Sequence, residues 1–401
     1  MLVPIRYTLR SLFVRRSATI LTLLGLAATV AVLAGVLALR AGFTTLFSDA
    51  GRDDVAVFLR PGAMSENQSY FRRELGDRLI KTLPEIAGTA GPEGAPIAAM
   101  ECASAVRLRK LGGDGVAETN VPVRGVQLAT FTLYDQVRIV EGRRFELGHD
   151  EVIVGRKLGA RIRDCRVGDV LNLNTTPFRV VGTFAAEGPF DTEIWGDFER
   201  INAALDRDGP TRIVARLRDD VRDDPRREDD PFDAMALRLK DDKETPATVM
   251  TDRRYLELQT EALGAVLLFL GGALSVIMGL AAVFTATNTM LAAVAGRTRE
   301  IGILLSVGFR PLPIFLSFLF ESLLLGLLGG AIGCLLALPI NGIETGTTNF
   351  ATFTEIAFAF RLTPEVMTSA ISFALLLGLL GGAIPAWRAA RLAPTEALRR
   401  R

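Results

Sequence analysis

Residues 262–296 read ALGAVLLFLGGALSVIMGLAAVFTATNTMLAAVAG and contain no Asp, Glu, Lys or Arg. A helix needs only about 20 such residues to cross the roughly 30 Å hydrocarbon core of a membrane. Three further uncharged stretches of 23, 22 and 22 residues occur at 17–39, 322–343 and 366–387. Because soluble core helices seldom stay uncharged for so long, the sequence predicts four transmembrane helices.

These stretches divide the chain into membrane-spanning and soluble parts. We expect a membrane protein of four transmembrane α-helices, with a mixed α/β extracytoplasmic domain inserted between helices 1 and 2. The expected segments are an amphipathic N-terminal helix at 1–16, transmembrane helices at 17–40, 261–296, 312–343 and 366–387, the extracytoplasmic domain at 41–260, a cytoplasmic helix at 297–311, a short extracytoplasmic loop at 344–365 and a tail at 388–401. The first span exceeds the usual apolar core of a signal peptide, so an uncleaved anchor is favoured.

The charge distribution predicts the orientation of the spans. Residues 41–260 contain 38 acidic and 32 basic residues, and 344–365 contain three Glu against Arg361. Arginine dominates the N-terminal flank, the segment 297–311 and the tail. Because positively charged loops stay in the cytoplasm, both termini of this multi-pass protein are expected on the cytoplasmic side of the plasma membrane.

Residues 41–260 have the mixed pattern of an α/β domain. Thr211–Leu217 alternates as a strand does, and Ala234–Leu239 is expected to pair with it. Asn67–Leu83 and Glu199–Leu205 are expected as helices. Asp219–Asp233 is charged and poor in apolar residues, and we interpret it as a surface loop rather than a cation site.

Cysteine and histidine are rare in this sequence. Cys102 and Cys165 both fall in the extracytoplasmic domain and are a candidate disulfide, although spacing alone does not show that they meet. Cys334 falls in the third span, and His149 is the single histidine. We therefore expect no metal site.

Glycines recur at four-residue spacing in the last two spans. This spacing lets two helix backbones approach closely in lipid, within one chain or between two chains. The glycines are Gly326, Gly329, Gly330, Gly333, Gly378 and Gly382.

Motifs of common enzymes are missing from the 401 residues. There is no Gly-x-x-x-x-Gly-Lys-Ser/Thr loop, Gly-x-Ser-x-Gly elbow, His-Glu-x-x-His or Cys-x-x-Cys. Glu321 is the one acid well inside a span. An interfacial anchor is favoured for it over a buried functional acid, because it lies close to the expected cytoplasmic end.

The segment 297–311 joins basic residues to an apolar stripe. Ile301, Leu304 and Leu305 fall at helical spacing, and Gly308 and Pro311 end the run. A short amphipathic helix of this kind can insert its apolar face into a partner's groove. The alternative is a basic loop that only sets the topology.

Several motifs in this order resemble the FtsX/MacB-like family of ABC transporter permeases. The specific ones are Asn288-Thr289-Met290, Arg-Glu-Ile-Gly-Ile-Leu at 299–304, Val307-Gly308 and the tail from Pro385 to Arg399. Gly125-Val126, Gly142-Arg143, Val154-Gly155, Val167-Gly168-Asp169 and Phe178–Gly182 resemble the family's periplasmic core domain.

The resemblance implies a permease without a catalytic site of its own, working with a separate ABC ATPase that binds ATP. The implied function is export, or the handling of lipids, lipoproteins or drugs outside the cytoplasm. The alternative is a non-transporting, FtsX-like signalling subunit that activates a cell-wall hydrolase. The implied ATPase-coupling residues are Arg297, Arg299, Glu300, Ile301, Gly302, Leu304, Val307 and Gly308.

The expected partners are the ATPase, a second identical or related permease, membrane lipids and a periplasmic adaptor. No nucleic-acid partner and no bound cofactor are expected. A stand-alone receptor or channel would leave the motif at 299–304 unexplained.

Overall fold

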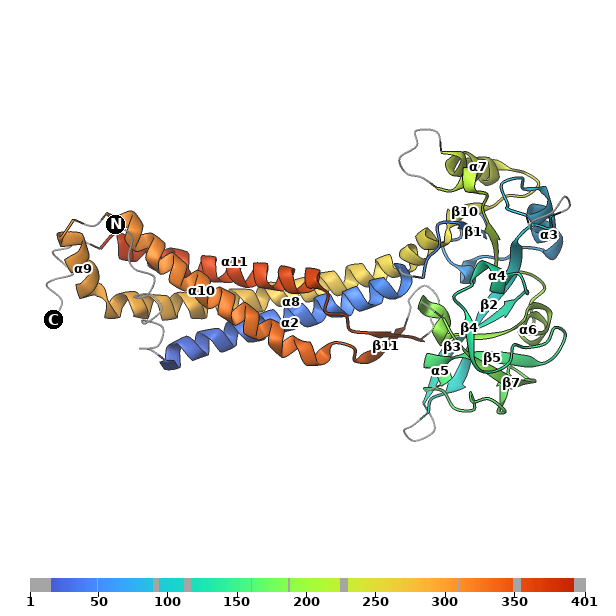
Figure 1. The fold of residues 1–401 in the computed structure, drawn as a ribbon, viewed down its shortest axis with the longest axis horizontal. Helices are drawn as coiled ribbons and strands as arrows, with labels where there is room; N and C mark the ends of the chain where they lie inside the picture. Colours follow the sequence, from blue (N-terminus) through green and yellow to red (C-terminus); the bar gives the residue numbers. More distant parts are fainter. Residues whose placement is uncertain are drawn as a thin grey trace. The chain divides into compact units, whose positions relative to one another are not determined.

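The computed structural model describes residues 16–48, 50–88, 94–111, 117–159, 161–186, 188–223, 230–308, 310–348 and 355–392. The chain divides into two compact units (Figure 1). The helical unit contains residues 1–42, 265–343 and 359–401, and the α/β unit contains residues 43–264 and 344–358. The expected amphipathic helix at 1–16 falls almost wholly outside the described residues.

Four helices in the described part of the chain are long and apolar enough to cross a membrane. They belong to α2 (Arg16–Ser48), α8 (Asp252–Gly296), α10 (Pro311–Ala337, followed by η4, Leu338–Ile340) and α11 (Pro364–Ala390). The short helix α9 (Thr298–Ser306) lies between α8 and α10. The predicted set of four membrane helices with an α/β domain after the first is confirmed.

The α/β unit is built on one ten-stranded sheet. Nine strands follow the order β10-β1-β9-β2-β3-β8-β5-β7-β4, and the tenth, β6, pairs with β7 outside this order. Most neighbouring strands are antiparallel, while β3 pairs with β8 and β5 pairs with β7 in parallel. The strands are β1 (Val55–Leu59), β2 (Ala98–Arg109), β3 (Glu118–Val126), β4 (Arg138–Gly142), β5 (Glu151–Gly155), β6 (Val170–Leu173), β7 (Thr176–Ala185), β8 (Ile194–Asp197), β9 (Arg212–Arg216) and β10 (Thr248–Thr251).

Short helices cover this sheet. α6 packs on β2 and β3, and α7 packs on β10, so that Phe58, Ile201, Met235 and other apolar side chains form one core. The helices are α3 (Arg73–Thr82), α4 (Thr130–Leu133), α5 (Arg156–Gly159), α6 (Phe198–Ala204) and α7 (Pro231–Asp241), with 3-10 turns η1 (Glu66–Gln68), η2 (Gly188–Thr192) and η3 (Asp219–Val221). A separate hairpin of β11 (Glu344–Thr348) and β12 (Glu355–Ala359) comes from the expected loop at 344–365.

Two predicted elements were wrong. Ala234–Leu239 is not a strand but part of α7, because Asp230 caps the helix through Phe232 N and Pro231 occupies its first turn. The expected helix at Asn67–Leu83 begins only at Arg73, after η1. The middle of the predicted surface loop, residues 224–229, lies outside the described residues.

Candidate functional site

The amphipathic segment between the second and third membrane helices forms α9. The backbone leaves α8 at Arg297 (φ −115°, ψ 12°), and the helix ends where Gly308 adopts φ +100°. A positive φ favours glycine because a Cβ atom would be strained there. Pro311 then begins α10 in its first turn, where a missing N–H costs little. These breaks make α9 a separate short helix.

The inner face of α9 packs against the other helices of the helical unit. Ile301 is 3% exposed and lies in a cluster with Val294 of α8, Phe318 of α10 and Ala389 of α11. Leu305 packs on the same cluster and Gly302 is buried. The expectation that Ile301 enters a partner's groove is therefore wrong, since its own chain already covers it.

The outer face of α9 carries two exposed aliphatic side chains. Ile303 is 46% and Val307 74% exposed, and Arg299 and Glu300 are exposed beside them. Leu304 is half-buried and lines a small cavity of about 20 Å³ together with Glu300, Ile301 and residues of α10. The face of α9 open to a partner is thus Arg299, Glu300, Ile303 and Val307.

Arg297 does not point freely into solvent. Its Nη1 lies 3.3 Å from Oε2 of Glu321 on α10, and Glu321 is 4% exposed. Glu321 is thus buried against its own chain and does not reach water, as an interfacial anchor was expected to do. The break between α8 and α9 brings a basic side chain to this acid from 24 positions earlier in the chain.

The predicted glycines lie where helices of the helical unit approach each other. A Cβ on Gly326 would lie 2.6 Å from the carbonyl oxygen of Ala374, and one on Gly378 would lie 2.6 Å from that of Ser322. Gly382 faces Ser322 Oγ. Gly330, one turn from Gly326, also lies against Ala374, whereas Gly329 and Gly333 lie against Leu26 and Val30 of α2.

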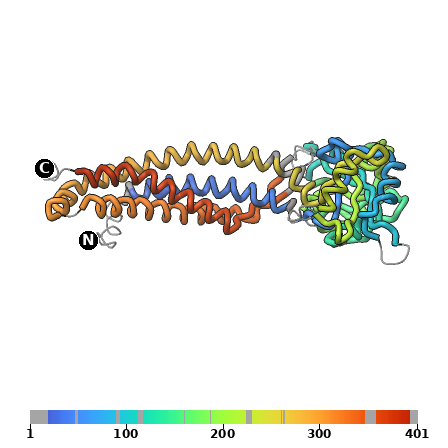
Figure 2. The backbone as a smooth tube through the Cα atoms, turned by 90° about the horizontal axis from the view of Figure 1, so that it is seen from above, coloured from blue at the N-terminus to red at the C-terminus, as the bar shows by residue number. Residues whose placement is uncertain are grey.

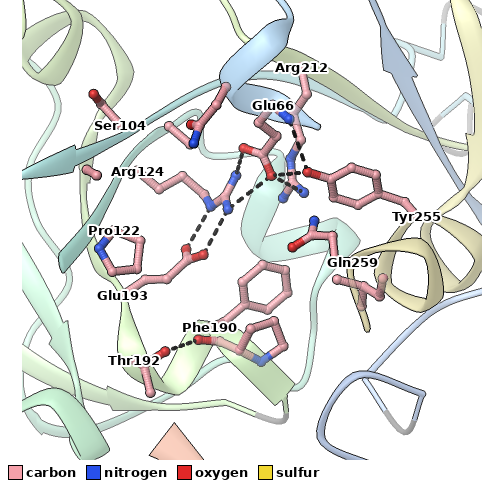
Figure 3. A pocket seen from close by; sticks show the side chains of 15 residues that line it. Glu66, Ser104, Pro122, Arg124, Phe190, Thr192, Glu193, Arg212, Tyr255 and Gln259 are labelled. Carbon is pink, nitrogen blue, oxygen red and sulfur yellow. Dashed lines mark hydrogen bonds and ion pairs between the residues drawn. The ribbon is translucent and has the colours of Figure 1, made fainter. Parts of the chain in front are cut away.

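The α/β unit contains a buried network of charges that no sequence motif indicated (Figure 3). The guanidinium of Arg124 on β3 donates to Glu193 from Nε (2.7 Å) and Nη2 (2.8 Å), and from Nη1 to Glu66 (2.7 Å). Arg212 on β9 donates to Glu66 (3.0 Å) and to Glu101 on β2 (2.8 Å). All five side chains are at most 6% exposed. Burial alone raises the pKa of Glu66, but the attraction of Arg124 and Arg212 outweighs it and lowers that pKa.

The first turn of α8 joins this network. Tyr255 OH donates to Glu66 Oε1 (3.0 Å), and Tyr134 OH donates to Asp252 Oδ1 (2.9 Å). Asp252 is fully buried, and burial raises its pKa to about 6, although Arg212 and Tyr134 act in the opposite direction. A cavity of about 50 Å³ lies against Glu66, Arg124, Glu193 and Tyr255.

The remaining predicted residues form no common site. Cys102 and Cys165 are free, buried thiols in the core of the α/β unit, so the candidate disulfide is not formed. Burial raises the pKa of each thiol to about 12. His149 is exposed, and its ring Nδ1 lies 3.1 Å from the carbonyl oxygen of Leu147. No group of three or more His, Cys, Asp or Glu in the described residues is arranged to hold a metal ion.

Two family models match the chain, one in its N-terminal half and one in its C-terminal part. Residues 19–228, just over half of the chain, match the MacB-like periplasmic core domain, and residues 272–394 match the FtsX-like permease C-terminal domain. The chain belongs to the MacB/FtsX-like family of ABC transporter permeases. The predicted family is therefore confirmed.

Curated relatives of this MacB/FtsX-like permease are longer than the chain. A macrolide export ATP-binding/permease protein MacB of Agrobacterium fabrum is 30% identical over 71% of the chain and 43% of that protein. MacB 2 of Aeromonas hydrophila is 27% identical over 98% of the chain and 60% of that protein. The pyoverdine export ATP-binding/permease protein PvdT of Pseudomonas fluorescens is 30% identical over 60% of the chain and 37% of that protein.

A solved structure, the periplasmic region of MacB from Actinobacillus actinomycetemcomitans, aligns with 51% of the MacB/FtsX-like permease and 92% of that region. The identity is 10% and the TM-score 0.36.

Sequence reasoning found α9 in this MacB/FtsX-like permease but missed the charge network. Glu66, Glu101, Arg124 and Arg212 stand on four different elements, Glu193 lies between η2 and β8, and the five residues have no common spacing. One local signal existed: Arg124 and Arg212 begin or interrupt otherwise apolar strand segments. A charged residue in such a position indicates a buried partner.

Proposed function

We propose that this chain is the transmembrane subunit of an ABC export system, coupling ATP hydrolysis by an ABC ATPase to conformational change in the α/β unit. The system would export a substrate or handle lipids, lipoproteins or drugs outside the cytoplasm. The observation that carries the proposal is the exposed face of α9, formed by Arg299, Glu300, Ile303 and Val307 on a helix otherwise packed into the helical unit.

The packing of α9 suits the transmission of force. Ile301 contacts a cluster shared by α8, α10 and α11, and Arg297 pairs with Glu321 of α10. A partner that moves α9 therefore moves side chains of three membrane helices, because closely packed interiors transmit strain. α2 and α8 each contribute residues to both units, which provides continuous helices for the coupling.

The comparisons favour export over signalling. The relatives are named for export of macrolides and pyoverdine and as ATP-binding/permease proteins. The match at 19–228 is to the periplasmic core domain of the MacB type. We extend to this chain a location in the bacterial inner membrane, cytoplasmic termini, and association with a second permease and a periplasmic adaptor.

Purification of the full chain from its native membrane, followed by mass spectrometry and ATPase assays, tests the proposal. We expect an ABC ATPase to co-purify and the isolated chain to hydrolyse no ATP. Reconstitution of both into vesicles should then give ATP-dependent efflux of a cargo added inside. Hydrolysis by the isolated chain, or purification with a cell-wall hydrolase and no ATPase, would refute the proposal.

A further inference from the structure

One strip in the C-terminal half of α11 is exposed. Leu376 (48% exposed), Leu380 (50%), Ile384 (55%) and Trp387 (51%) follow each other at spacings of three or four residues. Such residues lie on one face of a helix. Arg391 continues the strip one turn beyond Trp387.

The C-terminal end of α11, where the strip ends, lies at the same end of the helical unit as α9 (Figure 2). The guanidinium carbon of Arg391 lies 4.3 Å from the centre of the Trp387 ring, and Arg388 is exposed beside it. In the described part of the chain neither arginine is paired with a carboxylate. Tryptophan is enriched where a membrane meets water, and an arginine beside it reaches the level of the lipid phosphates.

The opposite face of α11 holds the small residues that favour helix contacts. Gly378 and Gly382 face α10, and a Cβ on Gly381 would lie 2.7 Å from the Cβ of Ala286 on α8. Ala386 and Ala389 are fully buried. Because helices associate in lipid through small residues, the strip of Leu, Ile and Trp suits acyl chains better than a second helix.

We propose that Trp387, Arg388 and Arg391 form a binding site for the phosphate head group of an anionic phospholipid, whose acyl chains lie along Leu376, Leu380 and Ile384. The two arginines supply the charge that favours an anionic over a zwitterionic head group. Arg391 stacks on Trp387, which holds its guanidinium at the end of the strip. This site is separate from the proposed ATPase-binding face of α9.

The chain offers a built-in reporter for this site. It contains two tryptophans, and Trp195 is completely buried in the α/β unit. Lipids with brominated acyl chains quench tryptophan only on contact, so quenching reports Trp387. The full chain is reconstituted in phosphatidylcholine nanodiscs that contain increasing fractions of brominated phosphatidylglycerol or, in parallel, brominated phosphatidylcholine.

We expect quenching of Trp387 to show a preference for phosphatidylglycerol. Each arginine should raise the affinity for phosphatidylglycerol over that for phosphatidylcholine by about five-fold. R388Q with R391Q should reduce the preference to about two-fold or less, since the local charge is gone. R299Q with R310Q removes two arginines from the same end of the chain's helical unit and should keep most of the preference. W387F should abolish the quenchable signal.

Three outcomes would overturn the site. Equal quenching by both lipids would show no anionic selectivity. Absence of quenching by either lipid would show that a second copy or another protein covers Trp387. Equal loss in both double variants would assign the preference to the general positive charge of this end rather than to Arg388 and Arg391.

Discussion

Arg297 and Glu321 form an ion pair, Nη1 to Oε2 at 3.3 Å, across the turn that separates α8 from α9. Glu321 is 4% exposed and Arg297 is largely buried, so neither charge is well hydrated. Ile301, one turn further along α9, packs against α8, α10 and α11. The pair therefore holds the start of α9 against α10 and leaves its other face open.

Replacing Glu321 by Gln should loosen α9. Removing one partner of a buried pair costs up to about 3–5 kcal/mol, because the remaining charge stays buried. We expect faster hydrogen exchange over 298–306 and loss of ATPase stimulation in the complex. Glu365→Gln, an exposed acid at the start of α11, is the matched control. Unchanged exchange in Glu321→Gln would show that the pair does not position α9.

Truncating the open face of α9 should weaken the ATPase complex. Burial of one such aliphatic side chain contributes about 1.5–3 kcal/mol. Ile303→Ala with Val307→Ala should therefore lower affinity by about two or more orders of magnitude, measured by binding of the purified ATPase. Leu128→Ala with Leu237→Ala, two exposed leucines of the α/β unit, should leave it unchanged. Full binding by the Ile303/Val307 variant would place the ATPase elsewhere.

A methyl group at Gly326 should separate α10 from α11. The added Cβ would lie 2.6 Å from the Ala374 carbonyl oxygen, and backbone cannot yield as a flexible side chain does. We expect Gly326→Ala to destabilise the helical unit by about 1–3 kcal/mol in detergent unfolding. Gly272→Ala on α8, where nothing lies within 4 Å of the new atom, serves as the control. Equal stability of the two variants would contradict the close approach.

Asp252 should make the stability of the α/β unit depend on pH. Its pKa is raised by burial from 3.8 to about 6, so the folded state binds the proton more tightly than the unfolded state. Its contribution to stability is full below about pH 4 and is lost as the pH rises through about 6. The loss is on the order of 3 kcal/mol.

Urea unfolding of the full chain, followed by Trp195 fluorescence in a W387F background, measures this effect. Asp252→Asn should flatten the profile between about pH 4 and 6 and raise stability at neutral pH. Asp53→Asn, an exposed acid that pairs with Arg253, should keep the wild-type profile. Below pH 4.5 a separate fall is expected, since the lowered pKa of Glu66 means that its ion pairs are lost as it protonates.

The predicted α9 shows how far sequence reasoning reached. Its existence followed from the apolar spacing, from Gly308 and from Pro311, which are local signals. Its orientation did not, because the apolar stripe of Ile301, Leu304 and Leu305 can face either a partner or the helices of its own chain, and the sequence does not distinguish the two. Only the packing of Ile301 on α8, α10 and α11 shows that Ile303 and Val307 remain open.

The sequence by itself determined the four membrane helices, the inserted α/β domain and the family. A membrane helix is recognised by an uninterrupted run of uncharged residues, and helices and strands are recognised by the period of their apolar residues. Both signals lie in contiguous sequence, so they can be recognised without the tertiary structure. Tertiary structure alone decided the partner of Glu321 and the network around Arg124 and Arg212. Those interactions join residues from distant elements, and a buried charge is stable only where the fold brings its partner within hydrogen-bond distance.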